Sequence, residues 1–201
     1  MPEQEFYYTI QQLSAAEFKD RGSRFLAYAF PAQNTNEAKE KLQALKKEHP
    51  KANHHCFAYR IGLDGNNFRV SDDDEPSGTA GKPILGQIDS KNLANVMIVV
   101  VRYFGGTLLG VPGLINAYKT AASLALQLTP IVQKPILIPY HLLFDYTLMN
   151  DIMMIVKQYN CAIEQQELTM FCSLQIGIPK SRLSDVLYRF QDIHSLEIHK
   201  L

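Results

Sequence analysis

Cysteine is scarce in this sequence, and the few cysteines show no pairing pattern. The 201 residues include only three of them, Cys56, Cys161 and Cys172. An odd number without any Cys-x-x-Cys spacing argues against both a disulfide framework and a zinc ribbon. The cysteine content therefore predicts a protein of a reducing cytoplasm.

Net charge and long apolar segments are also missing. Twenty Lys and Arg residues balance twenty Asp and Glu residues, so binding of nucleic acid or of an anionic membrane would need a local patch. The most apolar segment, Val96 to Val101, is far too short to span a bilayer. The first residues, MPEQEFYYTIQQ, do not resemble a targeting signal. We expect a soluble cytoplasmic protein with no membrane partner.

Several common functional motifs are absent. A calcium loop that starts at Asp72 fails because Pro76 stands at its fifth position, which should carry a ligand. A Walker A loop fails because Pro76 and Pro83 stand where it needs glycine and Ser or Thr. The chain has neither a Gly-x-Gly-x-x-Gly fingerprint nor a Gly-x-Ser-x-Gly elbow, and no cysteine has the sequence context of a nucleophile. The sequence therefore predicts no cofactor and no catalytic residue.

Residues 1–130 carry the pattern of one α+β domain. Apolar and β-branched stretches predict strands at 24–30, 54–62, 67–71 and 95–104, and helical patterns are present at 35–50 and 114–128. The Asp64-Gly65 pair indicates a hairpin between the second and third strands. Thr35 is the expected cap of the first helix, and Pro50 is its expected stop.

A second domain is predicted after a proline-rich segment. Pro130, Pro135 and Pro139 indicate a linker that leads into a strand. Residues 136–201 then follow the order strand, helix, strand, strand, helix, strand, which is the ferredoxin-like arrangement. The sequence thus predicts an α+β protein with two domains, at residues 1–130 and 136–201.

The stretch SDDDEPSGTAGKP, residues 71–83, joins four adjacent carboxylates to a glycine-containing segment that ends in lysine and proline. A helix is expected to begin after Thr79, which can cap it, with Pro83 in its first turn. The carboxylates could hold a divalent ion, or they could be a solvated acidic cap that the helix dipole favours. The sequence leaves both interpretations open.

A second glycine-rich segment follows the most apolar strand. Arg102 and Tyr103 end that strand, and Gly105, Gly106 and Gly110 lie between it and the next helix. Bare backbone amides in such a turn could approach an anion, whereas the alternative is a turn that needs glycine for positive φ and close packing. Two glycine-rich loops in one domain favour a binding site.

Together the two segments resemble a known signature. SDDDEPSGTAGKPIL, followed further along by VVVRYFGGTLLGVPGLINAY, is similar to the signature of the IMPACT/YigZ family. The resemblance implies a ribosomal protein S5 domain 2-like fold for the first domain. It implies a ferredoxin-like second domain that resembles the last domain of elongation factor G. The implied function is regulation of translation through RNA or ribosome-associated partners, with no established catalytic activity.

The chain departs from the family pattern in three places. Asp74 stands at the glycine of the usual Asp-x-Gly-Glu-Pro, Pro112 interrupts the usual Gly-Gly-Leu, and Asn116 replaces a basic residue. The missing basic charge and the added carboxylate both act against an expected phosphate contact.

We expect a binding site built from both loops. Its expected residues are Asp72, Asp73, Glu75, Gly78, Thr79, Gly81, Lys82, Arg102, Tyr103, Gly105, Gly106, Gly110 and Lys119. Lys82, Arg102 and Lys119 are the expected contacts with RNA phosphates. One alternative is a divalent-metal-dependent hydrolase that uses the carboxylates of the first loop. The other is a module that binds only a protein partner of the translation machinery.

Overall fold

The computed structural model describes residues 4–201, which form two compact units. The first unit runs from Tyr8 to Gln133, and the second contains Lys134–Leu201 together with residues 4–7. The chain passes between the units within the segment predicted as a linker. The grouping of residues 4–7 with the second unit has no counterpart in the sequence prediction.

The first unit is built on a five-stranded antiparallel sheet with the order β2-β3-β6-β4-β5. Its strands are β2 (Ser14–Asp20), β3 (Ser23–Pro31), β4 (His54–Arg60), β5 (Phe68–Ser71) and β6 (Val96–Tyr103). All but the last residue of the central β6 is buried. Its continuous apolar sequence reflects cover on both faces, whereas the short β5 forms one edge of the sheet.

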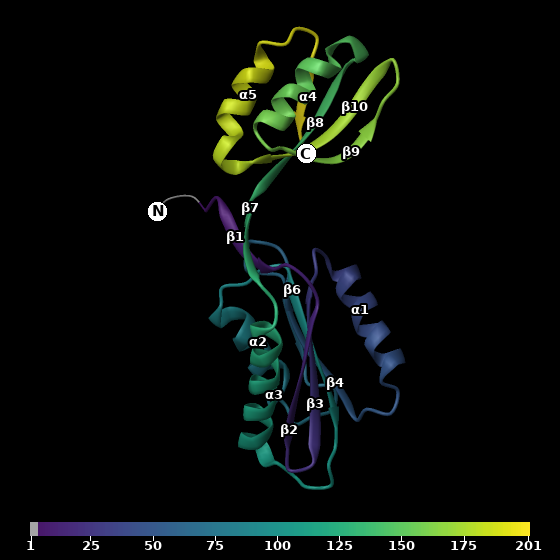
Figure 1. Cartoon of the computed structure of the whole chain (residues 1–201), viewed down its shortest axis with the longest axis vertical. Helices are drawn as coiled ribbons and strands as arrows, with labels where there is room; N and C mark the ends of the chain where they lie inside the picture. Colours follow the sequence, from purple (N-terminus) through teal and green to yellow (C-terminus); the bar gives the residue numbers. More distant parts are fainter. Residues whose placement is uncertain (1–3) are drawn as a thin grey trace. The chain divides into compact units, whose positions relative to one another are not determined.

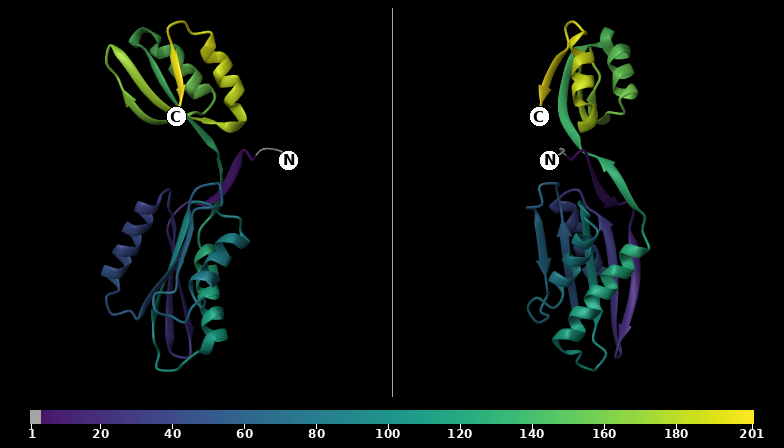
Figure 2. Two further views of the ribbon diagram at one scale, coloured as in Figure 1. Left: turned by 180° about the vertical axis from the view of Figure 1, so that it is seen from behind. Right: turned by 90° about the vertical axis from the view of Figure 1, so that its left-hand side faces the viewer.

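Helices cover both faces of this sheet (Figure 1 and Figure 2). They are α1 (Thr35–Glu48), α2 (Gly81–Ser90) and α3 (Gly110–Gln127). α2 and α3 share one face, where Ile84 and Tyr118 belong to the larger core, and Leu45 of α1 belongs to a separate core. Successive residues of a strand face opposite sides, so Ile98 enters the larger core and Val99 the other.

The start of α1 differs slightly from the sequence prediction. The cap is Asn34, whose Oδ1 accepts hydrogen bonds from the backbone N–H groups of Asn36 and Glu37 at 3.0 and 2.9 Å. The prediction of Thr35 as the cap is therefore wrong by one position. Asparagine caps at least as well as threonine, and its side chain is placed here to reach the first free amides.

The second unit has the predicted order of elements. They are β8 (Leu137–Asp145), η1 (Tyr146–Leu148), α4 (Met149–Gln158), β9 (Ala162–Glu167), β10 (Phe171–Pro179), η2 (Lys180–Arg182), α5 (Leu183–Gln191) and β11 (Glu197–Lys200). The strands form an antiparallel sheet with the order β11-β8-β10-β9. The core contains Leu142 and Leu174 from the sheet and Ile152 and Val186 from α4 and α5. None of the helices described in either unit is long and apolar enough to cross a membrane.

The proline-rich segment, predicted as a linker that leads into a strand, is itself mostly strand. β7 (Ile131–Pro135) pairs with β1 (Phe6–Ile10) in a two-stranded sheet, and Pro139 lies inside β8. The Pro139 carbonyl oxygen accepts a hydrogen bond from the Leu201 amide at 3.1 Å. Its nitrogen therefore points past the end of β11, where a missing N–H removes no bond of the ladder.

Candidate functional site

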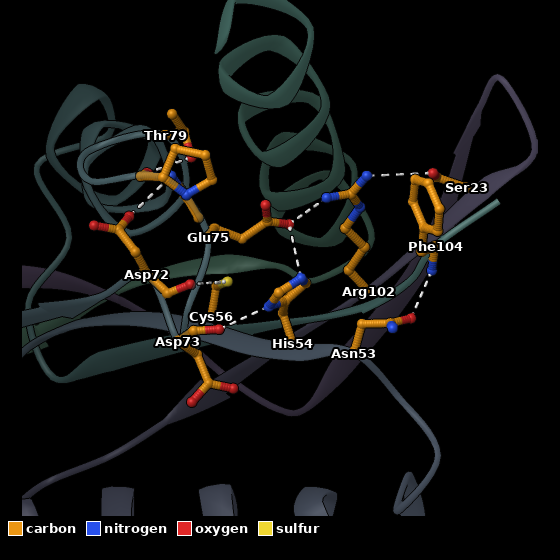
Figure 3. A network of polar contacts seen from close by, with 12 residues as sticks. Ser23, Asn53, His54, Cys56, Asp72, Asp73, Glu75, Thr79, Arg102 and Phe104 are labelled. Carbon is orange, nitrogen blue, oxygen red and sulfur yellow. Dashed lines mark hydrogen bonds and ion pairs between the residues drawn. The ribbon is translucent and has the colours of Figure 1, made fainter. Parts of the chain in front are cut away.

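The two glycine-rich loops of the first unit meet at one end of the sheet (Figure 3). Residues 72–80 lead from β5 into α2, and residues 104–109 lead from β6 into α3. Glu75 of the first loop reaches Arg102 at the end of β6. The structure therefore brings the two predicted halves of the site together.

The side-chain carboxylate of Asp72 lies at the N-terminus of α2. Its Oδ1 accepts hydrogen bonds from the backbone N–H groups of Ala80 and Gly81 at 3.0 and 2.8 Å, and its Oδ2 accepts one from Gly78 at 2.8 Å. Burial acts to raise the pKa of Asp72, but these hydrogen bonds and the charge of Lys82 together hold it below its ordinary value. The place where a helix N-terminus would bind an external anion is filled by a carboxylate of the chain.

Asp72 thus has the capping role that the sequence prediction assigned to Thr79. The Thr79 hydroxyl donates instead to the Pro76 carbonyl oxygen at 2.7 Å, and α2 has no side-chain bond from its cap position. The prediction is wrong because a charged acceptor bonds more strongly to free amides than a neutral hydroxyl does. Gly81 permits the close approach, since a Cβ there would lie 2.8 Å from the Ser71 backbone nitrogen.

Asp73 points away from the α2 amides. Its Oδ2 accepts a hydrogen bond from the backbone N–H of His55 at 2.6 Å, and its Oδ1 lies 3.4 Å from Nζ of Lys46 on α1. Its carbonyl oxygen accepts a hydrogen bond from Nδ1 of His54 at 2.7 Å. Asp73 and Asp74 have φ values of 43° and 70°. The turn therefore places two consecutive residues in the left-handed region.

Glu75 and Arg102 form a buried ion pair, with side chains 3% and 6% exposed. Oε1 of Glu75 accepts hydrogen bonds from Nη1 of Arg102 at 2.5 Å and from the Tyr118 hydroxyl at 2.8 Å, and it lies 3.7 Å from Nε2 of His54. Burial raises the pKa of Tyr118, which keeps its hydroxyl protonated as a donor. The two charges neutralise each other, and the pair ties the first loop to β6.

The Arg102 guanidinium is enclosed by internal groups. It lies between two aromatic rings, 5.4 Å from the centroid of Phe25 and 5.7 Å from that of Phe104. Its Nη2 donates to Oγ of Ser23 at 3.4 Å. Its buried Nε has no hydrogen-bond partner among residues 4–201. Arg102 is therefore held by the protein interior rather than presented to solvent.

The geometry does not support a metal site or a reactive thiol here. Asp72, Asp73 and Glu75 are directed to three different sets of partners, and residues 4–201 contain no group of three His, Cys, Asp or Glu placed to hold a metal ion. Cys56 is buried, and burial raises the pKa of its thiol, which donates to the Asp72 carbonyl oxygen at 2.9 Å. The three carboxylates are therefore not arranged to ligate one metal ion together.

A groove of about 450 Å³ opens beside this polar network. We call it the Phe104 groove, and it is lined by Asn53, His54, Glu75, Pro76, Arg102, Phe104, Leu108, Leu109, Gly110, Val111 and Leu114. The charged residues lie at its base, and its walls are mostly apolar. Leu108 is 82% exposed, and Phe104 and Val111 are also exposed, at 45% and 52%. The groove therefore presents apolar side chains to water above a neutralised base.

Glycines shape the loop that forms one wall. A Cβ on Gly105 would overlap the backbone of Gly22 in the β2–β3 turn. Gly106 and Gly110 have φ values of 85° and 71°, a region that side chains disfavour. The backbone N–H of Phe104 donates to Oδ1 of Asn53 at 2.8 Å. The backbone N–H of Gly105 donates to Oγ of Ser23 at 3.2 Å. The loop is thus fixed by close backbone approach and by these two side-chain acceptors.

Of the thirteen predicted site residues, three line the groove, namely Glu75, Arg102 and Gly110, and the other ten do not. Tyr103 faces the other side of the sheet, where its hydroxyl lies 2.9 Å from Nδ1 of His49, because it follows Arg102 in a strand. Lys82 on α2 and Lys119 on α3 are exposed but are not part of the groove lining. Of the predicted phosphate contacts, only these two lysines reach solvent freely.

The sequence prediction missed the groove walls. Leu108 and Val111 are apolar residues of the glycine-rich segment that no predicted helix or strand includes, and Phe104 is the last residue of a predicted strand. The absence of a helical or strand period at Leu108 and Val111 is the signal that could have indicated exposed apolar side chains. His54 and Asn53, which come from the other side of the groove, carry no comparable signal.

The first unit is thus an α+β domain with a groove between its two glycine-rich loops, and it is joined to a second α+β unit. A family model described as the Impact N-terminal domain matches residues 21–126, more than half of the chain. The chain therefore belongs to the IMPACT family, and the resemblance seen in its two loop motifs is confirmed.

Relatives share most of the length of this chain. IMPACT family member YigZ of Escherichia coli is 33% identical over 172 residues, which are 85% of this chain and 84% of the relative. IMPACT family member YvyE of Bacillus subtilis is 37% identical over 146 residues, which are 73% and 67%.

Two solved structures resemble the chain to different degrees. The crystal structure of a hypothetical protein has a TM-score of 0.79 and 29% identity, and the match covers 99% of this chain and 98% of that one. The structure described as the two-domain translational regulator Yih1 is 30% identical over 61% of this chain and 47% of its own, with a TM-score of 0.36. The fold of the whole chain is therefore shared with the first of them.

Proposed function

We propose that this chain regulates translation by docking a protein partner of the translation machinery in the Phe104 groove. The role in translation is the one that membership of the IMPACT family implies. The observation that carries the mode of binding is Leu108, which is 82% exposed at a groove with apolar walls. Exposed apolar side chains around a concave site are typical of protein interaction surfaces.

The charges at the site favour a protein partner over an RNA backbone. Arg102 is neutralised by Glu75, and the α2 N-terminus is occupied by Asp72. Phosphate binding at the two loops would rest on Lys82 and Lys119 alone. Affinity for RNA depends strongly on the number of phosphates that are neutralised, so two lysines would support only weak binding. RNA binding through these loops stays a prediction, and the experiment below tests it.

The two units also support the folds that the resemblance implies. We propose a ferredoxin-like fold for the second unit, since its β-α-β-β-α-β order is combined with the sheet order β11-β8-β10-β9. We propose a ribosomal protein S5 domain 2-like fold for the first unit, which the family resemblance supports. The cytoplasmic location stays a prediction.

Cosedimentation of the full chain with purified ribosomal subunits and with a translating cell extract tests the proposal. Leu108→Asp is expected to weaken association by about 2 kcal/mol or more, close to thirtyfold, because it places a charge where an apolar anchor enters the partner. Leu128→Asp is the matched control, since Leu128 is 63% exposed at the end of α3 and does not line the groove.

The same experiment separates the alternatives. Association that survives Leu108→Asp but falls with nuclease, with salt and with Lys82→Ala or Lys119→Ala would replace the protein partner with RNA. Equal loss for Leu108→Asp and Leu128→Asp would show that the groove has no specific role. No association under any of these conditions would contradict the proposal.

A further inference from the structure

A second cleft, of about 270 Å³, opens on the face of the first unit that carries α1. We call it the Tyr59 cleft, and it is lined by Ala38, Lys39, Leu42, Lys46, Phe57, Tyr59, Arg69, Ser71, Asp73 and Met97. It shares no lining residue with the Phe104 groove. Binding here is therefore a separate question from the proposed function.

The strand register explains why this cleft stays open. Tyr59 lies opposite Arg69, and Phe57 lies opposite Ser71, in the β4–β5 hairpin. All four side chains therefore face the same side of the sheet. α1 packs on that side, but the core beneath it contains residues of β3, β4 and β6 and none of β5. The edge strand is left uncovered beside the helix.

The cleft carries positive charge although the chain as a whole is neutral. Lys39, Lys46 and Arg69 face a single carboxylate, that of Asp73, so two positive charges are unbalanced. Lys46 lies 3.4 Å from Asp73, whereas Lys39 and Arg69 pair with no carboxylate in the described part of the chain. A concave site with excess charge of one sign attracts ligands of the other sign.

Flat surfaces lie next to these charges. The rings of Phe57 and Tyr59 are stacked, with centroids 6.3 Å apart and planes 13° apart. The Arg69 guanidinium lies 6.0 Å from the Phe57 centroid. Between residues 4 and 201 no group bonds to the hydroxyls of Tyr59 and Ser71. Such a site suits a ligand that is planar at one end and anionic at the other.

We propose that the Tyr59 cleft binds a nucleotide, either free or as one unit of a single-stranded RNA. The phosphate pairs with Lys39 and Arg69, and the base lies against the Tyr59 ring. An acidic peptide would match the charge but would leave the flat surface unused. The volume lies just below the range of about 300–1,000 Å³ that is usual for small-molecule pockets, which suits one base rather than a stack of several.

Titration of the full chain with UMP, AMP and labelled oligouridylate tests this proposal, by NMR for the mononucleotides and by fluorescence anisotropy for the RNA. Arg69→Ala and Tyr59→Leu are expected to weaken binding about tenfold. Lys39→Ala is expected to reduce the slope of log K against log salt for the RNA by about 0.7. Lys47→Ala is the control, because this exposed lysine of α1 does not line the cleft.

The outcomes show whether the cleft binds a nucleotide, and whether that nucleotide is free or part of an RNA. Weakening of RNA and mononucleotides together assigns the cleft to nucleotides in general, and weakening of RNA alone assigns it to RNA. Binding that is unchanged in both Arg69→Ala and Tyr59→Leu overturns the proposal, and so does equally tight binding of polyglutamate. Arg69 is exposed on an edge strand, so its variant is expected to fold, and a thermal melt checks this. Leu108→Asp leaves the cleft intact, so failure here is distinct from failure at the Phe104 groove.

Discussion

At the residue scale, the carboxylate of Glu75 has neighbours from three elements: Arg102 on β6, Tyr118 on α3 and His54 on β4. Glu75→Ala leaves the Arg102 charge buried without its partner. We expect the free energy of unfolding to fall by about 3–5 kcal/mol, as measured by urea denaturation. Glu17→Ala is the control, since it removes the partner of the exposed Arg24 and is expected to change stability little. Equal losses in the two variants would contradict the role of the buried pair.

The cap formed by Asp72 predicts a pH dependence. Its pKa lies below the ordinary value of 3.8 in the folded protein, so the folded state favours the ionised form. The resulting stability is present above the ordinary pKa and is lost as the pH falls through the lowered folded value. Asp72→Asn is therefore expected to be less stable than the parent near neutral pH. The difference should shrink below about pH 4, as followed by urea denaturation across pH. A difference that stays constant with pH would show that the charge of Asp72 does not matter.

Asp74 is a position where removal of a side chain should help. Its φ of 70° and its exposure give an Asp side chain a conformational cost without a visible contact. Glycine adopts positive φ without strain. Asp74→Gly is expected to raise the free energy of unfolding by up to about 1 kcal/mol, as measured by denaturant midpoint. A loss of stability would mean that the carboxylate has a partner that offsets the strain.

At the element scale, the turn between β2 and β3 is packed against the loop between β6 and α3. The contact is backbone to backbone at Gly22 and Gly105, whereas a Cβ on Gly106 would meet nothing within 4 Å. Gly105→Ala must separate the two loops, and Gly106→Ala has only its positive φ to accommodate. We expect Gly106→Ala to cost about 1 kcal/mol and Gly105→Ala clearly more, by thermal denaturation. The reverse order would contradict the close approach.

The strands and loops also determine which neighbouring polar side chains share a contact. Arg102 and Tyr103 are neighbours in the sequence, but they face opposite sides of β6, so only Arg102 contributes to the groove. Asp72 and Asp73 lie in the loop after β5 and also have different partners, since Asp72 accepts from the α2 amides and Asp73 lies next to Lys46 of α1. The carboxylates of Asp72, Asp73 and Glu75 look like one cluster in the sequence, but they contact the α2 amides, Lys46 and Arg102 respectively.

At the scale of the whole molecule, the pairing of the N-terminal strand determines where a stable fragment of the first unit should end. β1 pairs with β7, and Ile10 of β1 is fully buried in the larger core of the first unit. A fragment that ends at Pro135 keeps this pairing, whereas one that ends at Pro130 loses it. We expect the longer fragment to be the more stable, as measured by urea denaturation. Equal stability would show that β7 contributes nothing to the first unit.

Much of the order of elements could be predicted from the sequence, because periodicity and turn residues act over short distances. The apolar run of β6, the Asp64-Gly65 hairpin and the six elements of the second unit are all present. The caps of α1 and α2 were misassigned because several nearby polar side chains could serve, and only their positions decide which one does. The strand β7 was missed because prolines mark its two ends, and a proline is tolerated at the end of a strand or where its nitrogen faces no partner.

The sequence by itself determined most of the helices and strands, the two glycine-rich loops and the family, since each depends on residues close together in the chain. It did not indicate β1, β2 or β7, which pair with segments elsewhere in the chain. Only the tertiary structure decided which charges are free. Glu75 meets Arg102 across 27 positions, and Arg69 of an edge strand faces Lys39 of a helix across one cleft. Charged side chains find partners through the packing of sheet and helices, and no local pattern encodes that distance. The same packing leaves Leu108 exposed at the groove and Lys39 unpaired at the cleft.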